Sequence, residues 1–182
     1  MNRSVHSLSP LPKASSWFVL RFALGFLILL PTLVWFLGGN GPNRIINRSV
    51  GGLVTAQVKV AGLIIRLVDS EVVTRRTTLS GRSFSCEVDS GCNGMMAVSL
   101  LLAGLIAMPS TWIRRSVGAC FLVPAALLVN IFRLAGLYYL GAHKPDWFGL
   151  AHVYFGQVLT ILIVTMLWFI WLTWNSSSQK LS

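Results

Sequence analysis

Long apolar runs alternate along this chain with short polar segments rich in glycine and proline. Because about 20 apolar residues cross the hydrocarbon core of a bilayer as a helix, the runs predict membrane-spanning helices. The predicted spans cover residues 16–38, 94–112, 117–140 and 152–174. We therefore expect a single membrane domain over residues 16–174, between polar cytoplasmic tails at residues 1–15 and 175–182.

The segment at residues 45–68 has a mixed pattern. Val58, Ala61, Ile65 and Val68 recur at helical spacing, whereas Gln57, Lys59 and Arg66 are polar. This amphipathic pattern favours an interfacial or groove-forming helix over a lipid-exposed span. The alternative is that the segment crosses the membrane, which would invert the topology of all later spans.

Residues 71–88 have the pattern of a small β-hairpin. Strand-favouring residues are followed by a Ser80-Gly81 turn and by an alternating polar and apolar stretch. An open hairpin leaves backbone groups unpaired, so it must lie in water or against the protein. The predicted fold is an all-α, multi-pass membrane bundle of four firm transmembrane helices plus an amphipathic helix, with a small extracytoplasmic β-hairpin.

Composition agrees with a membrane protein. The chain is 54% hydrophobic and 11% charged, with a mean hydropathy of +0.70, whereas soluble proteins are about a quarter charged. The net charge of +10 is scattered among apolar runs. Membrane topology and anionic lipid headgroups account for it better than nucleic acid, which we exclude as a partner because no basic soluble domain is present.

The short connections follow the positive-inside rule. With the first helix entering from the cytoplasm, the Arg114-Arg115 connection is inside and residues 141–151 are outside. Residues 39–93 would be outside although they carry seven basic residues. Long translocated segments are less bound by the rule, so we retain this topology.

Three residues with chemical potential fall near the outer face in this arrangement. Cys92 opens the second predicted span, His152 opens the fourth, and Arg133 lies within the third, three residues after Asn130 on one helical face. Ionisable side chains in or beside lipid are costly and indicate function. Cys and His together form an activated nucleophile, and Arg stabilises an oxyanion.

Each residue also has an ordinary interpretation when taken singly. Arg133 would be bound to carbonyls or lipid phosphate, His152 would be a hydrated interfacial side chain, and Cys92 would be a small residue at a helix start. The convergence of three suitable groups on one face favours the functional interpretation. Asp89 is interpreted as a helix cap, and His143 as a solvated loop residue.

The chain has two further cysteines, Cys86 and Cys120. An odd number of cysteines leaves at least one thiol free. Cys120 lies inside an apolar run, where a small buried thiol is the ordinary interpretation. There is no CxxC motif and the three histidines lack ligand spacing, so we expect neither a metal site nor a cofactor.

The motifs around these residues resemble those of the exosortase/archaeosortase family of multi-pass membrane cysteine transpeptidases. Cys92-Asn93-Gly94 is similar to the family's Cys-Ser-Gly segment, and Asn130-Ile131-Phe132-Arg133 is similar to its Asn-x-x-Arg motif. His152 stands near the start of the last span, as in the family. Order and spacing agree, and the resemblance covers about residues 45–174.

The resemblance implies a function. Cys92 would be the nucleophile, His152 the general acid/base and Arg133 the oxyanion stabiliser. Substrates would be exported proteins with a C-terminal tripartite sorting signal, made of a recognition motif, a transmembrane helix and a basic cluster. The protein body would pass to a lipid or glycan acceptor. The enzyme would be a multi-pass protein of the inner or cytoplasmic membrane, with its active site facing outside the cytoplasm.

Two other classes of protein compete with this reading. A four-helix membrane thiol oxidoreductase would use Cys86 and Cys92, although no second exchanging pair is evident. A non-enzymatic channel, transporter or assembly subunit would line a polar path with Arg133. Oxidoreduction needs both cysteines, transpeptidation needs only Cys92, and a channel tolerates the loss of either.

Overall fold

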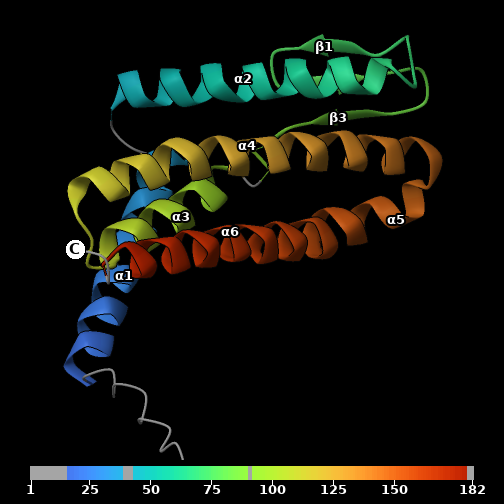
Figure 1. The fold of residues 1–182 in the computed structure, drawn as a ribbon. Helices are drawn as coiled ribbons and strands as arrows, with labels where there is room; N and C mark the ends of the chain where they lie inside the picture. The colour runs from blue at the N-terminus through green and yellow to red at the C-terminus, as the bar shows by residue number, and fades with distance from the viewer. Residues whose placement is uncertain (1–15, 39–42, 90–91, 180–182) are drawn as a thin grey trace, which may run out of the picture.

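The structure, a computed structural model, describes residues 16–38, 43–89 and 92–179. The described chain is mainly helical (Figure 1). Its elements are α1 (Ser16–Leu37), α2 (Arg44–Arg66), β1 (Val73–Arg75), β2 (Thr78–Ser80), β3 (Ser85–Glu87), α3 (Met95–Ala107), α4 (Trp112–His143), α5 (Pro145–Leu150), the π-helical turn η1 (Ala151–Phe155) and α6 (Gly156–Gln179). The predicted fold class, an α-helical membrane bundle with a small β element, is confirmed. The predicted tail at residues 1–15 lies outside the described residues.

Four helical stretches of the described chain are long and apolar enough to cross a membrane, which agrees in number with the sequence. They are Val19–Leu37, Arg44–Arg66, Trp112–His143 and Pro145–Ser176. The set differs in one member, because the span expected at residues 94–112 is the 13-residue helix α3. At about 1.5 Å per residue α3 is about 20 Å long, shorter than the roughly 30 Å hydrocarbon core. Met108 is extended with ψ 137°, because a residue before proline, here Pro109, avoids the helical region.

One predicted boundary is corrected at the end of the bundle where α4 begins. The connection expected at Arg114-Arg115 is the first turn of α4, where the Thr111 side chain accepts a hydrogen bond from the Arg114 N–H at 3.5 Å. The helix α6 runs to Gln179, into the segment that we expect to be a polar cytoplasmic tail. Arg114 Nη1 donates to Asn175 O at 3.4 Å, so the start of α4 lies against the end of α6.

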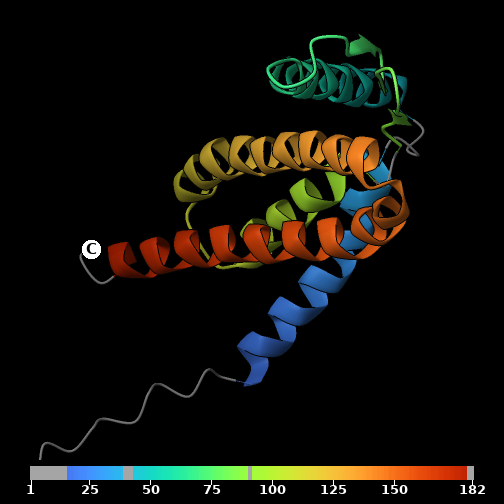
Figure 2. The same ribbon diagram turned by 90° about the vertical axis from the view of Figure 1, so that its right-hand side faces the viewer.

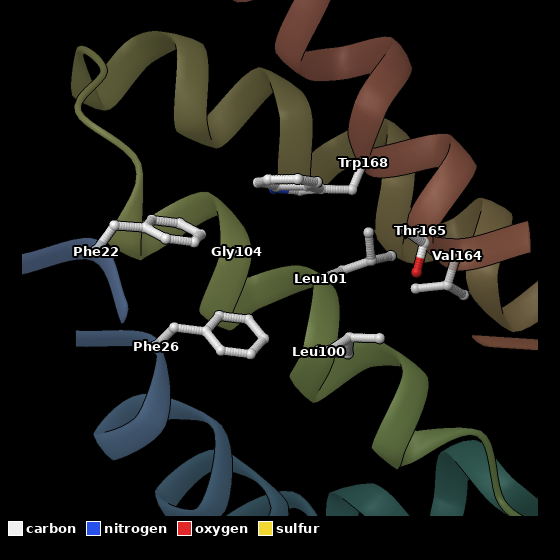
Figure 3. Close-up of a pocket in the computed structure, with 8 residues that line it drawn as sticks. All are labelled: Phe22, Phe26, Leu100, Leu101, Gly104, Val164, Thr165 and Trp168. Carbon is white, nitrogen blue, oxygen red and sulfur yellow. The ribbon is translucent and has the colours of Figure 1, made fainter. Parts of the chain in front are cut away.

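The helices α4 and α6 run antiparallel and side by side, with α3 packed against both (Figures 1 and 2). Their shared core is apolar and includes Leu101, Leu105 and Val164. The first helix, α1, packs obliquely on α3. A cavity of about 200 Å³ between α1, α3 and α6 (Figure 3) is lined by apolar side chains apart from Thr165. The outward faces of these helices expose many large apolar side chains, as a lipid environment requires.

The amphipathic helix expected near residues 45–68 is α2. Its buried face includes Val54, Val58, Ala61 and Ile65, which share one core with residues of α4 and of the sheet. Lys59 is exposed on the opposite face. Figure 2 views α2 nearly along its axis while α4 and α6 are seen from the side, so α2 crosses α4 instead of running alongside it.

The predicted hairpin is present and is extended by a third strand. The strands pair antiparallel in the order β1-β2-β3, with Leu79 opposite Thr74 on one side and Cys86 on the other. The second turn is the predicted Ser80-Gly81 region. The first turn was not predicted; it places Arg76 at φ 49°, a left-handed conformation that non-glycine residues rarely adopt.

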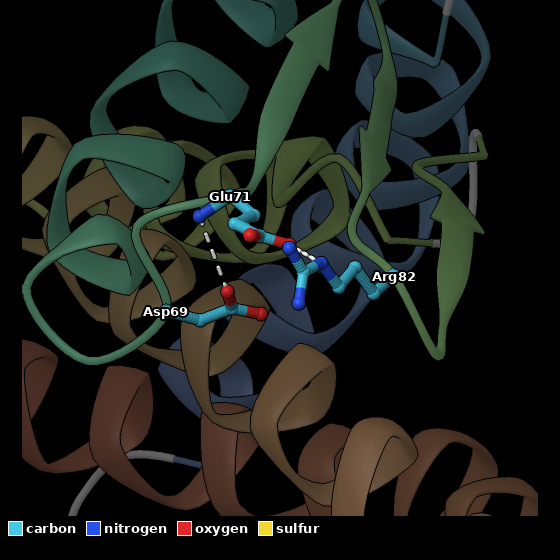
Figure 4. A network of polar contacts seen from close by, with 3 residues as sticks. All are labelled: Asp69, Glu71 and Arg82. Atoms are coloured by element: carbon cyan, nitrogen blue, oxygen red, sulfur yellow. Dashed lines mark hydrogen bonds and ion pairs between the residues drawn. The ribbon is translucent and has the colours of Figure 1, made fainter.

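The sheet packs against α2 near the end of the bundle where α4 is followed by α5, the sheet end (Figure 1). Phe84 packs edge-on against Phe148 of α5, with ring centroids 5.0 Å apart. A cleft of about 600 Å³ lies between the end of α2 and the segment after it, the turn between β2 and β3, and α4. At this cleft Arg82 forms an ion pair with Glu71, whose N–H donates to Asp69 Oδ1 at 3.2 Å (Figure 4).

Candidate active site

A thiol and an imidazole from distant parts of the chain meet near the sheet end of the bundle. Cys92 Sγ and His152 Nε2 form a hydrogen bond, although the residues are 60 positions apart in sequence. Cys92 lies just before α3, where its N–H donates to Asp89 O at 2.9 Å. Its side chain is only 5% exposed. The pair is therefore held in a protected environment by the fold.

The guanidinium of Arg133 reaches both members of this pair from α4. Its Nη2 lies 3.7 Å from Cys92 Sγ and donates to His152 O at 3.4 Å. Arg133 Nε is buried and has no hydrogen-bond partner among the described residues. The three candidates from the sequence thus form one cluster, and one donor of the guanidinium is left for another acceptor.

The π-helical turn η1 shapes the His152 side of the cluster. Its widened hydrogen bonding is seen where the Gly156 N–H donates to Ala151 O, and such turns occur often at functional sites. The ring of Phe148 stacks on His152 with centroids 5.5 Å apart and an interplanar angle of 18°. At Gly156 a Cβ atom would lie 2.8 Å from Arg133 Nε. Glycine at this position therefore leaves the space that the Arg133 guanidinium occupies.

The side chain that follows Cys92 in sequence caps the start of α3. Asn93 Oδ1 accepts a hydrogen bond from the Met95 N–H at 2.9 Å, at the start of α3. Asn93 thus satisfies the first N–H group of the helix, while the capping role expected of Asp89 stays a prediction. Gly94 has φ +76°, and a Cβ there would lie 2.9 Å from the Asn130 side chain, so this position requires glycine.

Two amide side chains lie behind the thiol. Asn130, on the same face of α4 as Arg133, donates through Nδ2 to Cys92 O at 3.1 Å and to Gln57 Oε1 at 2.9 Å. Gln57 Nε2 donates to Asn93 O at 3.2 Å. Sequence reasoning noted Asn130 but gave Gln57 no role. The available signal was a glutamine within the apolar stripe of α2.

The other two cysteines lie outside the cluster, and all three carry free thiols. Cys86, in β3, is half-buried, and burial together with the neighbouring Cys92 raises its pKa to about 11. Cys120 is exposed on α4, so the expectation of a buried thiol was wrong. His143 is exposed, as expected, and stacks on Tyr139.

Burial and charge act in opposite directions on the candidate nucleophile. Burial raises the pKa of the Cys92 thiol above its ordinary value, and the nearby Arg133 guanidinium opposes this rise. Burial thus favours the protonated form of the thiol, which is hydrogen-bonded to the His152 side chain. Such a pair generates the thiolate when the proton passes to the imidazole, and an adjacent guanidinium can stabilise developing negative charge.

Fold and cluster together define a multi-pass helical membrane protein with a partly buried Cys–His pair at one end of its bundle. A family model described as transmembrane exosortase (Exosortase_EpsH) matches residues 4–169. The chain belongs to the transmembrane exosortase family, and this membership supports a general role as a membrane transpeptidase. Among curated proteins and solved structures, no match to the chain was found.

Proposed function

We propose that this protein is a membrane cysteine transpeptidase. It cleaves the C-terminal sorting signals of exported proteins and transfers the protein body to a lipid or glycan acceptor. The observation that carries the proposal is the hydrogen bond between Cys92 and His152, with the Arg133 guanidinium 3.7 Å from the sulfur. Membership in the exosortase family supports the same chemistry.

The reaction follows from these groups. His152 Nε2 takes the thiol proton as Cys92 Sγ attacks the scissile carbonyl carbon, and Arg133 stabilises the oxyanion. The imidazolium then protonates the departing amine, the C–N bond breaks and a thioester remains. An acceptor hydroxyl or amine attacks the thioester, and its proton passes to His152. The proton then returns to the leaving thiolate of Cys92.

The substrate's own transmembrane helix binds, in this proposal, along an apolar groove of about 530 Å³ between α4 and α6. Arg133 is the one charged side chain in its wall, and the remaining lining includes Phe132, Leu137, Leu159 and Ile163. A substrate helix in the groove would therefore pass beside Arg133. The low dielectric there strengthens the interaction of Arg133 with an oxyanion.

The distribution of charge supports a site that faces outside the cytoplasm. The five acidic residues all lie in residues 69–89 or at Asp146, in the segments of the sheet end. Arg114 and Arg115 lie at the opposite end of α4. Under the positive-inside rule the arginine end is cytoplasmic, so we assign the protein to the inner or cytoplasmic membrane with the cluster on the outer side.

Accessibility labelling tests this orientation. With all three cysteines replaced by serine, Asn43→Cys and Pro145→Cys should each react with an impermeant maleimide applied to intact cells. Both positions are exposed and adjoin helix starts on the proposed outer side. The control Ser116→Cys, near the arginine pair, should react only after permeabilisation. Reaction of position 145 from the cytoplasm alone would overturn the assignment.

The variant Cys86→Ser separates transpeptidation from thiol oxidoreduction. Processing of a tailed substrate should stay within about twofold of wild type, because a thiol with a pKa of about 11 is protonated at neutral pH and a poor nucleophile. Substrate cleavage is measured by gel mobility, with Cys120→Ser as the matched control. If Cys86→Ser is produced normally but loses processing, the two cysteines act as a redox pair and the proposed mechanism is wrong.

A further inference from the structure

Gln57 is a polar residue in an apolar face. It is 3% exposed and lies between Val54 and Val58 on the side of α2 that packs against α4. A buried amide is costly unless hydrogen bonds replace those it made with water. Both ends of this amide are bonded, since Oε1 accepts from Asn130 Nδ2 at 2.9 Å and Nε2 donates to Asn93 O at 3.2 Å.

These bonds converge on the backbone that carries the thiol. Asn130 Nδ2 also donates to Cys92 O at 3.1 Å. The two consecutive carbonyls that follow the Cys92 Cα atom are therefore each held by a side-chain amide, Cys92 O by Asn130 and Asn93 O by Gln57. Just beyond them, Gly94 turns with φ +76° against the Asn130 side chain. The orientation of the two peptide planes is thus set from α2 and α4.

The arrangement leaves one polar atom unsatisfied. Both partners of Asn130 Nδ2 are acceptors, so only the amide nitrogen can face them. Asn130 is 0% exposed, and its Oδ1 has no hydrogen-bond partner within the described part of the chain. A packed apolar pair would avoid this cost. A network that retains an unsatisfied group beside a reactive thiol is better explained by geometry than by stability.

We propose that Gln57 is a positioning residue for the Cys92 nucleophile. It acts through Asn93 O and through Asn130, and it fixes the direction of Cys92 Sγ toward His152 Nε2 and Arg133. The inference rests on the proposed function for its catalytic consequence, but the positioning itself can be measured without a substrate. This positioning also gives α2 a role beyond packing, because the position of α2 against α4 then determines the direction of Cys92 Sγ.

The test uses Gln57→Met, which keeps the length of the side chain and removes both hydrogen bonds. In a background of Cys86→Ser and Cys120→Ser, Cys92 is the remaining thiol, and its alkylation by iodoacetamide is followed against pH. The pH midpoint of Cys92 alkylation should move to higher pH. Without the two hydrogen bonds the thiolate is no longer held at a fixed distance from Arg133, so the guanidinium stabilises it less. With a tailed substrate, kcat should fall about 10- to 100-fold, the scale of a displacement of about 1 Å. KM should stay within about twofold.

Two further variants separate positioning from stability. Val58→Ala removes methyl groups from the position next to Gln57. Val58 is 0% exposed and belongs to the core that α2 shares with α4 and the sheet. It should lower the melting temperature without moving the alkylation midpoint or kcat. Gln57→Glu has the same shape and keeps the acceptor for Asn130, but its ionised form cannot donate to Asn93 O. It should also raise the midpoint, and it serves if Gln57→Met does not fold.

The outcomes are distinct. If both Gln57 variants keep the midpoint of the background protein and its kcat within about twofold, Gln57 is not a positioning residue. Equal loss of kcat in Val58→Ala and Gln57→Met, with unmoved midpoints, would likewise overturn the proposal in favour of a packing role. A raised midpoint in Gln57→Met together with no cleavage of tailed substrates by the background protein would support positioning and reject the proposed function.

Discussion

Replacing Cys92 with alanine is expected to abolish processing, with uncleaved tailed substrate accumulating in the membrane. Removal of a nucleophile costs on the order of 10⁶-fold in rate in a well-studied hydrolase. Neither remaining thiol can substitute, because Cys86 has a pKa of about 11 and Cys120 is exposed on α4. The measurements are gel mobility of the substrate and hydroxylamine release of a thioester-linked intermediate, which should be absent from the variant.

The matched control is Cys120→Ala, the same substitution on a described helix outside the cluster. It should process substrate at the wild-type rate. Both variants should be produced in equal amounts and elute as folded protein, since Cys92→Ala removes a single sulfur atom. Near-normal cleavage by Cys92→Ala would show that the transpeptidase mechanism is wrong.

The second large effect is expected from Arg133→Lys, with kcat reduced about 10²- to 10³-fold, the usual cost of losing an oxyanion donor. The substitution keeps the charge but loses the planar fork. In the structure that fork places Nη2 near both Cys92 Sγ and His152 O and leaves Nε without a partner among the described residues, whereas the compact ammonium of lysine lacks this spread of donors. The measurement is kcat and KM with a tailed substrate.

Arg115→Lys is the matched control on the same helix. Arg115 Nη2 donates to Met108 O at 2.9 Å, at the opposite end of α4. Its replacement should leave kcat unchanged. If Arg133→Lys retains kcat within about tenfold of wild type, a delocalised guanidinium is not needed and the oxyanion role proposed for Arg133 fails.

Some features of the site followed directly from local sequence. Cys92, Arg133 and His152 were recognisable because ionisable groups near lipid are costly and so are rarely retained without a role. Helical spacing in α2 identified the buried face that includes Val58 and Ile65. The same reasoning could not assign Gln57, because its partners lie 36 and 73 residues away in sequence. Their approach depends on how α2 crosses α4.

Membrane surroundings explain the clearest error. In water, an apolar run indicates burial in protein, but in lipid the exposed side of a helix is equally apolar. Cys120 therefore could not be assigned to the core or to the lipid side from its neighbours alone, and it lies on the exposed side. One helix end was also placed wrongly, because the Arg114-Arg115 pair was interpreted as a loop although it lies in the first turn of α4.

By itself, then, the sequence determined the helical membrane class, the small β element and the three candidate residues. These depend on composition, on periodicity and on the cost of charge near lipid, all of which are local. Tertiary structure alone decided that Cys92 meets His152 and that η1 and Gly156 admit the Arg133 guanidinium. It also decided that two amides hold the backbone around the thiol, because such contacts arise only when helices distant in sequence pack together.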